Sequence, residues 1–177
     1  MLNTLMIILT FLFLIMIAYQ DIKNNQVSWF LFPLAFATVV SNGLLALDYK
    51  DYFLIFLINL SIVLFMFCGV ALYYFIKNKK LTNIIDAKIG TGDILFLIVL
   101  SAAFSLFNFI IFMVLSLIAA ICLHLIINIF RKYKSKHIPL AGILSVFYIL
   151  LLVSNSIFGN PKMFDDTFFM KLIFNTI

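Results

Sequence analysis

Two aspartates are placed where their carboxyl groups could act together as a catalytic pair. Asp21 lies at the end of the first apolar run, and Asp93 closes the motif Gly90-Thr91-Gly92-Asp93 at the start of a later apolar run. The chain contains no glutamate and only seven acidic residues, and ionised carboxylates are costly beside a membrane. Two carboxyl groups held within about 3–5 Å share a proton, so one can deprotonate a water while the other protonates a leaving group.

The residues around Asp93 admit two interpretations. Gly90 and Gly92 lack side chains, so they let the backbone turn sharply and let a substrate strand approach the carboxylate. A helix cap explains the same motif without catalysis, because aspartate is a favoured N-cap residue and preceding glycines form an ordinary turn. Asp86 is a further candidate for binding a basic segment of a substrate, although a solvated loop charge is the simpler explanation.

The elements that must position these residues are membrane helices. Hydrophobic residues make up 66% of the chain, charged residues 11%, and the mean hydropathy is +1.22, values typical of an integral membrane protein. Because one helix needs about 20 apolar residues to cross the hydrocarbon core, we predict an all-α, polytopic bundle of about six transmembrane helices. Their expected spans are Leu2–Tyr19, Val27–Leu47, Tyr52–Ile76, Ile94–Phe107, Phe109–Phe130 and Leu140–Phe158.

Two features of this division stay open. Only Ser105 and Asn108 interrupt the apolar run between the fourth and fifth spans, so five helices are an alternative. We assign residues 1–158 to a single transmembrane domain and residues 159–177 to a short C-terminal tail whose pattern suits the membrane interface.

The distribution of basic residues predicts the orientation. Nine of the twelve Lys and Arg residues fall on one side, in three predicted loops: Lys23; Lys77, Lys79, Lys80 and Lys88; Arg131, Lys132, Lys134 and Lys136. We therefore expect both termini outside and these loops in the cytoplasm, with Asp21 and Asp93 at the same cytoplasmic boundary. The net charge of +5 follows from this bias and from attraction to anionic lipid, so the bilayer and not nucleic acid is the expected partner. Without a Cys/His cluster at ligand spacing, we expect no metal and no cofactor.

Three segments together resemble the type IV prepilin peptidase family, whose members are G-x-G-D intramembrane aspartic proteases. They are Asp21 to Trp29, Gly90 to Leu95, and His137 to Leu144, in which a basic loop and Ile138-Pro139 precede the last helix. The resemblance implies that Asp21 and Asp93 are the catalytic pair. It further implies cleavage of the leader peptide from prepilin or pseudopilin-like substrates at the cytoplasmic face of the bacterial inner membrane.

The chain departs from the family pattern at several places. Ser28 stands where the family usually has proline, Trp29 where it often has asparagine, and Leu95 where many members have lysine. The cytoplasmic loop with two C-x-x-C pairs found in longer members is absent, so we expect peptidase activity without methyltransferase activity, as in short preflagellin peptidases. Two other functions stay open: a catalytically silent relative that binds pilin-like helices, and a small proton- or ion-coupled transporter that uses the same aspartates.

Overall fold

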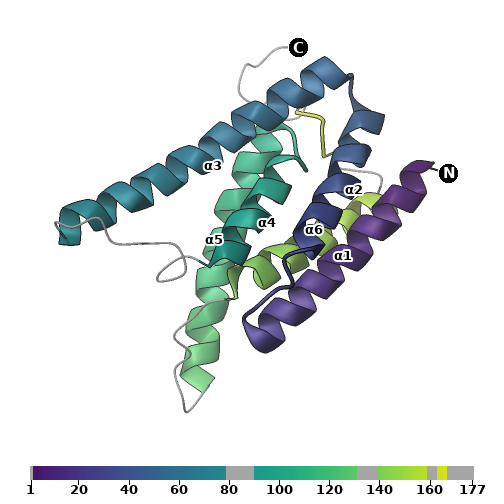
Figure 1. Cartoon of the computed structure of the whole chain (residues 1–177). Helices are drawn as coiled ribbons and strands as arrows, with labels where there is room; N and C mark the ends of the chain where they lie inside the picture. Colours follow the sequence, from purple (N-terminus) through teal and green to yellow (C-terminus); the bar gives the residue numbers. More distant parts are fainter. Residues whose placement is uncertain (1, 79–89, 131–138, 159–162, 167–177) are drawn as a thin grey trace.

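The computed structural model describes residues 2–78, 90–130, 139–158 and 163–166, and the regular secondary structure in this part of the chain consists of six α-helices (Figure 1). The helices are α1 (Leu2–Asn24), α2 (Leu31–Ala46), α3 (Tyr49–Asn78), α4 (Thr91–Ser101), α5 (Leu106–Phe130) and α6 (Leu140–Phe158). The predicted all-α class and the count of six helices are confirmed. The division between the fourth and fifth helices is confirmed as well, since residues 102–105 separate α4 from α5.

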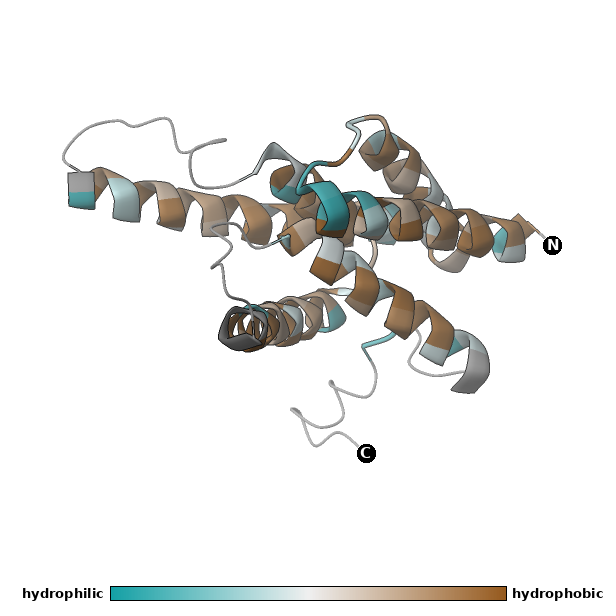
Figure 2. Ribbon diagram, turned by 90° about the horizontal axis from the view of Figure 1, so that it is seen from below, coloured by the Kyte–Doolittle hydropathy of each residue, from teal (hydrophilic) through white to brown (hydrophobic). Residues whose placement is uncertain are grey.

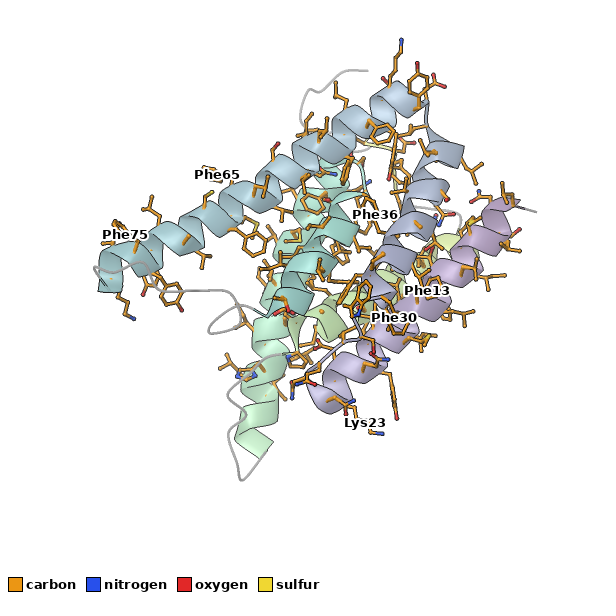
Figure 3. All side chains as sticks on the ribbon, viewed as in Figure 1. Phe13, Lys23, Phe30, Phe36, Phe65 and Phe75 are labelled. Carbon is orange, nitrogen blue, oxygen red and sulfur yellow. The ribbon has the colours of Figure 1, made fainter. Side chains whose placement is uncertain are left out.

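Three of the helices contain stretches that are long and apolar enough to cross a membrane. These stretches are Leu2–Asn24 in α1, Tyr49–Lys77 in α3 and Leu106–Ile126 in α5. Most of the helical ribbon in Figure 2 has the colour of hydrophobic residues, and Phe65, labelled on α3 in Figure 3, is 80% exposed. Such large apolar side chains suit contact with lipid, and the three helices indicate a multi-pass membrane protein. Crossing of the membrane by α2, α4 and α6 stays a prediction.

Three helix ends differ from the predicted spans by four residues or more. The largest difference is at the end of α4, which stops at Ser101 and not at the predicted Phe107. Helix α1 continues to Asn24, five residues beyond the predicted Tyr19, so Asp21 lies inside its last turn. The helix ends there because Asn25 adopts the left-handed conformation (φ 51°) and its backbone N–H donates to the Asp21 carbonyl at 2.8 Å. Helix α2 begins at Leu31 and not at Val27. Hydropathy marks the apolar span of a helix, and polar residues can extend the helix beyond it.

Helix α1 packs mainly against α2 and α6, while α4 contacts α2, α3 and α6. The buried core between these helices is apolar, and each helix contributes to it through residues such as Ile17 in α1, Phe32 in α2 and Leu100 in α4. Aromatic rings extend this core from the α4–α5 break into α5 and α6. The Phe104 ring stacks on Phe112 of α5 with centroids 4.8 Å apart and lies 5.2 Å from the ring of Tyr148 in α6. The consequence for the site is that the ends of α1, α4 and α6 are held in fixed relation.

The break between α4 and α5 is stabilised by polar side chains of α3. The buried Asn59 side chain donates to the carbonyls of Ser101 (3.1 Å) and Phe104 (2.9 Å), and the Tyr52 hydroxyl donates to the Ala102 carbonyl at 3.1 Å. The carbonyls at a helix end lack partners within the helix, and burying them unpaired is costly. Residues of α3 therefore fix where α4 ends.

Tyr52 reaches this break because Gly43 of α2 has no side chain. A β-carbon at position 43 would lie 2.1 Å from the Cε2 atom of the Tyr52 ring, far inside van der Waals contact. This close approach of two helices is one of the ordinary roles of glycine in membrane proteins.

Candidate active site

Asp21 projects from the last turn of α1 into a buried position. Its side chain is only 7% exposed, and its Oδ2 atom accepts a hydrogen bond of 2.6 Å from the backbone N–H of Gly142 in α6. Gly142 is 121 positions later in the chain. The docking of α6 on α1 therefore brings a backbone donor to this carboxylate.

Asp93 lies in the first turn of α4 and is half-buried. Its Oδ1 atom accepts a hydrogen bond of 3.0 Å from the backbone N–H of Ala141. The N-cap residue of α4 is Gly90, three positions before Asp93, and the Gly90 backbone N–H also favours the ionised Asp93 carboxylate. The interpretation of Asp93 as the N-cap residue is therefore wrong, because Gly90 holds that position and Asp93 is the third residue of the helix. From there its carboxylate is stabilised by the Gly90 N–H and accepts the bond from α6.

The two carboxylates meet at the N-terminus of one helix. Ala141 and Gly142 are consecutive residues in the first turn of α6, and each donates its backbone N–H to a different aspartate. The first N–H groups of a helix have no partner within it, and the helix dipole is positive at this end. The beginning of α6 thus offers two adjacent donors to the two carboxyl groups.

The electrostatics of Asp93 show that the two aspartates influence each other. Burial raises the pKa of Asp93 to about 6, with a further upward contribution from the negative charge of Asp21. The backbone N–H groups of Ala141 and Gly90 oppose this rise because they stabilise the ionised form. A carboxyl group with such a pKa can exchange a proton near neutral pH, which general acid and base catalysis requires.

Gly142 is a site residue to which the sequence alone assigned no role. A β-carbon at position 142 would lie 3.0 Å from Cγ1 of Ile22 and 3.1 Å from both Cβ and Oδ2 of Asp21. Glycine therefore lets α6 approach the Asp21 side chain closely. The available signal was the succession of Pro139, at the predicted start of the helix, and the small residues Ala141 and Gly142.

The two glycines predicted to assist Asp93 occupy different environments. Gly90 has an ordinary extended backbone (φ −66°, ψ 137°), and a β-carbon there would lie 3.3 Å from the Asp93 Oδ2 atom. A β-carbon at Gly92 would make ordinary contact with the Phe32 ring at 3.5 Å. A side chain at position 90 would therefore crowd the carboxylate, one at position 92 would pack on Phe32, and neither glycine needs a left-handed backbone.

The one remaining predicted site residue lies outside the described residues. Asp86 falls in 79–89, which the structure does not describe. The Lys23 ammonium donates to the Tyr19 hydroxyl at 2.9 Å on the exposed surface of α1 (Figure 3). Of the positions that depart from the family pattern, Ser28 donates its backbone N–H to Gln20 at 2.8 Å, and Trp29 and Leu95 are 74% and 39% exposed.

No larger ligand cluster surrounds the pair in the part of the chain that the structure describes, where no three His, Cys, Asp or Glu side chains come together. Comparison with known proteins adds no relative, because no family model, no curated protein and no solved structure matches this chain. Any function must therefore be inferred from the residues and from the convergence of Asp21 and Asp93 on α6.

Proposed function

We propose that this protein is an intramembrane aspartic endopeptidase that uses Asp21 and Asp93 to activate water. The observation that carries the proposal is the pair of hydrogen bonds from consecutive N–H groups of α6 to the two carboxylates. Holding two acidic side chains together in a mostly apolar protein costs free energy, so their presence points to a functional role. Paired carboxylates are the arrangement that aspartic proteases use.

In the proposed reaction the pair carries one proton. The ionised carboxylate removes a proton from water, whose oxygen attacks the carbonyl carbon of the scissile peptide bond, while the protonated carboxyl donates its proton to the carbonyl oxygen. The resulting gem-diol intermediate then collapses as the C–N bond breaks. One of its hydroxyls returns a proton to the carboxylate that had protonated the carbonyl oxygen, and the leaving nitrogen takes up a proton from the carboxyl that received one from water. The pair returns to its singly protonated state, so protons and electrons balance.

The proposed substrate is the leader peptide of a prepilin or pseudopilin-like protein, cut at the cytoplasmic face of the bacterial inner membrane. The support for this choice is the resemblance of the segments around Asp21, Asp93 and Pro139 to prepilin peptidases, together with the basic loops that predict a cytoplasmic site. A basic leader would approach that face, and the apolar segment after the cleavage site would stay in the membrane.

Leader cleavage of a co-expressed prepilin-like substrate tests the proposal. Wild type, Asp21→Asn and Asp93→Asn are compared at matched protein levels, with Asp48→Asn as the control because Asp48 is exposed and Asn is an equally good N-cap before α3. We expect wild type and Asp48→Asn to release the leader and both site variants to fail, since an amide keeps the shape of the side chain and lacks its acid–base function.

The other possible functions give different results. If the wild type binds the substrate without cutting it, the protein is a silent relative that holds pilin-like helices. If it shows pH-coupled ion flux that both site variants abolish, and no cleavage, it is a transporter. A site variant that keeps full cleavage would remove that aspartate from the proposed pair.

A further inference from the structure

A cavity of about 430 Å³ lies at the opposite end of α1 from Asp21. Its wall comes from α1, α2, α6 and the break between α4 and α5, together with three of the four residues 163–166; we call this segment the strap. The lining residue Asn3 and Asp21 are separated by most of the length of α1, about 27 Å at the rise of an α-helix. The cavity is therefore distinct from the carboxylate pair, and the inference drawn from it does not depend on the proposed function.

The strap forms part of the cavity wall without belonging to a helix. It contributes Met163 and Phe164 to the lining, and its four residues are half-buried. In Figure 1 it is the short yellow segment between α2 and the start of α5. Most of the other lining residues belong to helices whose packing forms the core. Movement of the strap therefore does not require any helix to unfold.

Hydrogen bonds fasten the strap to the start of α5. The Ser105 backbone N–H donates to the Met163 carbonyl at 2.9 Å, and the Ser105 hydroxyl donates to the Asp166 carboxylate. The Asn108 side-chain amide donates to the same Met163 carbonyl at 3.2 Å. The strap is thus held at the first turn of α5 mainly by polar groups.

Polar bonds of this kind can be exchanged for bonds to water. Each contributes little net stability, because a group that loses its partner in the protein regains one from water once water reaches it. Ser105 is only 1% exposed, so its hydroxyl and N–H meet water only when the strap moves away. The apolar side chains of Met163 and Phe164 are already half exposed, so release of the strap adds little hydrocarbon surface to water.

We propose that the strap is a lid, which detaches from the start of α5 and opens the cavity to water at this end of the helix bundle. In the open state the helices keep their packing, and water replaces the strap as the partner of Ser105. The fastening bonds set the population of the open state, so the loss of one bond raises that population by a corresponding factor.

The reactivity of a cysteine in the cavity wall tests the lid. Cys68 and Cys122, which are exposed, are first replaced by alanine. Val39→Cys then places a thiol on the cavity wall, and Val99→Cys places one in the core; both valines are 1% exposed, and of the two Val39 lines the cavity. The full chain in phosphatidylcholine nanodiscs is treated with a water-soluble methanethiosulfonate, which reacts with the thiolate and so requires water at the sulfur. Mass spectrometry follows the labelling with time.

We expect Val39→Cys to be labelled faster than Val99→Cys when the strap is intact. Adding Ser105→Ala or Asp166→Ala should accelerate the labelling of Val39→Cys about tenfold, the usual size of one lost hydrogen bond. The same two changes should leave the labelling of Val99→Cys unchanged, because the lid opens without loosening the core.

Matched variants separate the lid from general effects of substitution. Ser61→Ala is the control for Ser105→Ala, since the exposed Ser61 hydroxyl bonds the Leu57 carbonyl of its own helix, and it should change neither labelling rate. A second cysteine pair keeps the test decisive if Val39→Cys fails to fold. It consists of Leu152→Cys on the cavity wall and Leu97→Cys in the core, at two leucines that are both 7% exposed.

Three results would overturn the proposal. Equally slow labelling of Val39→Cys and Val99→Cys with the strap intact would make the strap a fixed wall. Equal acceleration of both by Ser105→Ala would mean that the whole fold had loosened. Faster labelling of Val39→Cys that neither Ser105→Ala nor Asp166→Ala increases would place the opening elsewhere in the cavity wall.

Discussion

The backbone of Gly142 lies so close to Asp21 that a β-carbon at position 142 would be 3.1 Å from both the Cβ and the Oδ2 atom of that aspartate. The same glycine donates its N–H to Asp21 Oδ2 at 2.6 Å. Gly142 therefore supplies both the hydrogen-bond donor to Asp21 and the space that the Asp21 side chain needs. Any side chain here must move either α6 or the Asp21 carboxylate.

Replacing Gly142 by alanine should slow leader cleavage about tenfold while the protein stays folded. The added methyl group forces a shift of a few tenths of an ångström, and misplacing a catalytic group by about 1 Å can cost a hundredfold in rate. The rate is measured under single-turnover conditions in nanodiscs. Gly69→Ala is the control, since a β-carbon there meets nothing within 4 Å. An unchanged rate in Gly142→Ala would show that the close contact does not position Asp21.

The rate of cleavage should fall as pH rises above about 6. Burial, together with the charge of Asp21, raises the pKa of Asp93 to about 6, so the pair holds a proton below this pH and becomes doubly ionised above it. A doubly ionised pair has no proton to donate to the scissile carbonyl. Cleavage of a leader peptide in nanodiscs, measured between about pH 5 and pH 8, checks this expectation. A rate that stays constant to the upper end of that range would contradict it.

The Gly43→Ala substitution should destabilise the fold by about 1–3 kcal/mol, the usual cost of overpacking. Its β-carbon would lie 2.1 Å from the Tyr52 ring, which must then move away from the Ala102 carbonyl that its hydroxyl bonds. Thermal unfolding in nanodiscs, with Gly69→Ala as the matched change in an open position, measures the effect. Equal melting temperatures for the two variants would show that the ring moves at no cost.

Asn59→Ala should cost about 2–4 kcal/mol, because two buried carbonyls, those of Ser101 and Phe104, lose their donor. The loss falls at the junction of α4 and α5, so hydrogen exchange should accelerate at the end of α4 before it does so in α1. Ser61→Ala serves as the control, since the exposed Ser61 hydroxyl bonds only the Leu57 carbonyl of its own helix. Uniform exchange throughout the variant would argue against a local role.

Trp29 should report the depth of the segment that follows Asp21. It is the single tryptophan of the chain and is 74% exposed, and tryptophan favours the headgroup level of a bilayer. We expect its fluorescence to be quenched more strongly by lipids brominated near the headgroup than by lipids brominated at the chain ends. The Trp29→Phe variant provides the background signal. Stronger quenching by the deep bromines would place this end of α1 inside the hydrocarbon core.

Composition and hydropathy were sufficient to predict the helical class, and they matched both ends of α6, since Pro139 precedes its start and most of its residues are apolar. They were wrong for the end of α1, because four of residues 20–24 are polar and still form a helical turn. They were also wrong for the end of α4, because apolar residues follow Ser101 and lie outside the helix. The two helices predicted between Asp21 and Asp93 implied that both aspartates lie at the same membrane boundary. In the structure both aspartates are bonded to the start of α6. Hydropathy could not predict the hydrogen bonds from the backbone N–H groups of Ala141 and Gly142, because almost every residue type has such a group.

The anchoring of both aspartates on α6 also has a consequence for biogenesis. Asp21 and Asp93 are synthesised early, but their common partners are 121 and 48 positions farther along the chain. Contacts of such long separation form late in folding. A nascent chain that has inserted α1 to α4 therefore carries both acids without the helix end that aligns them. Under the proposed function, the chain therefore becomes competent for hydrolysis only after its last helix has been inserted.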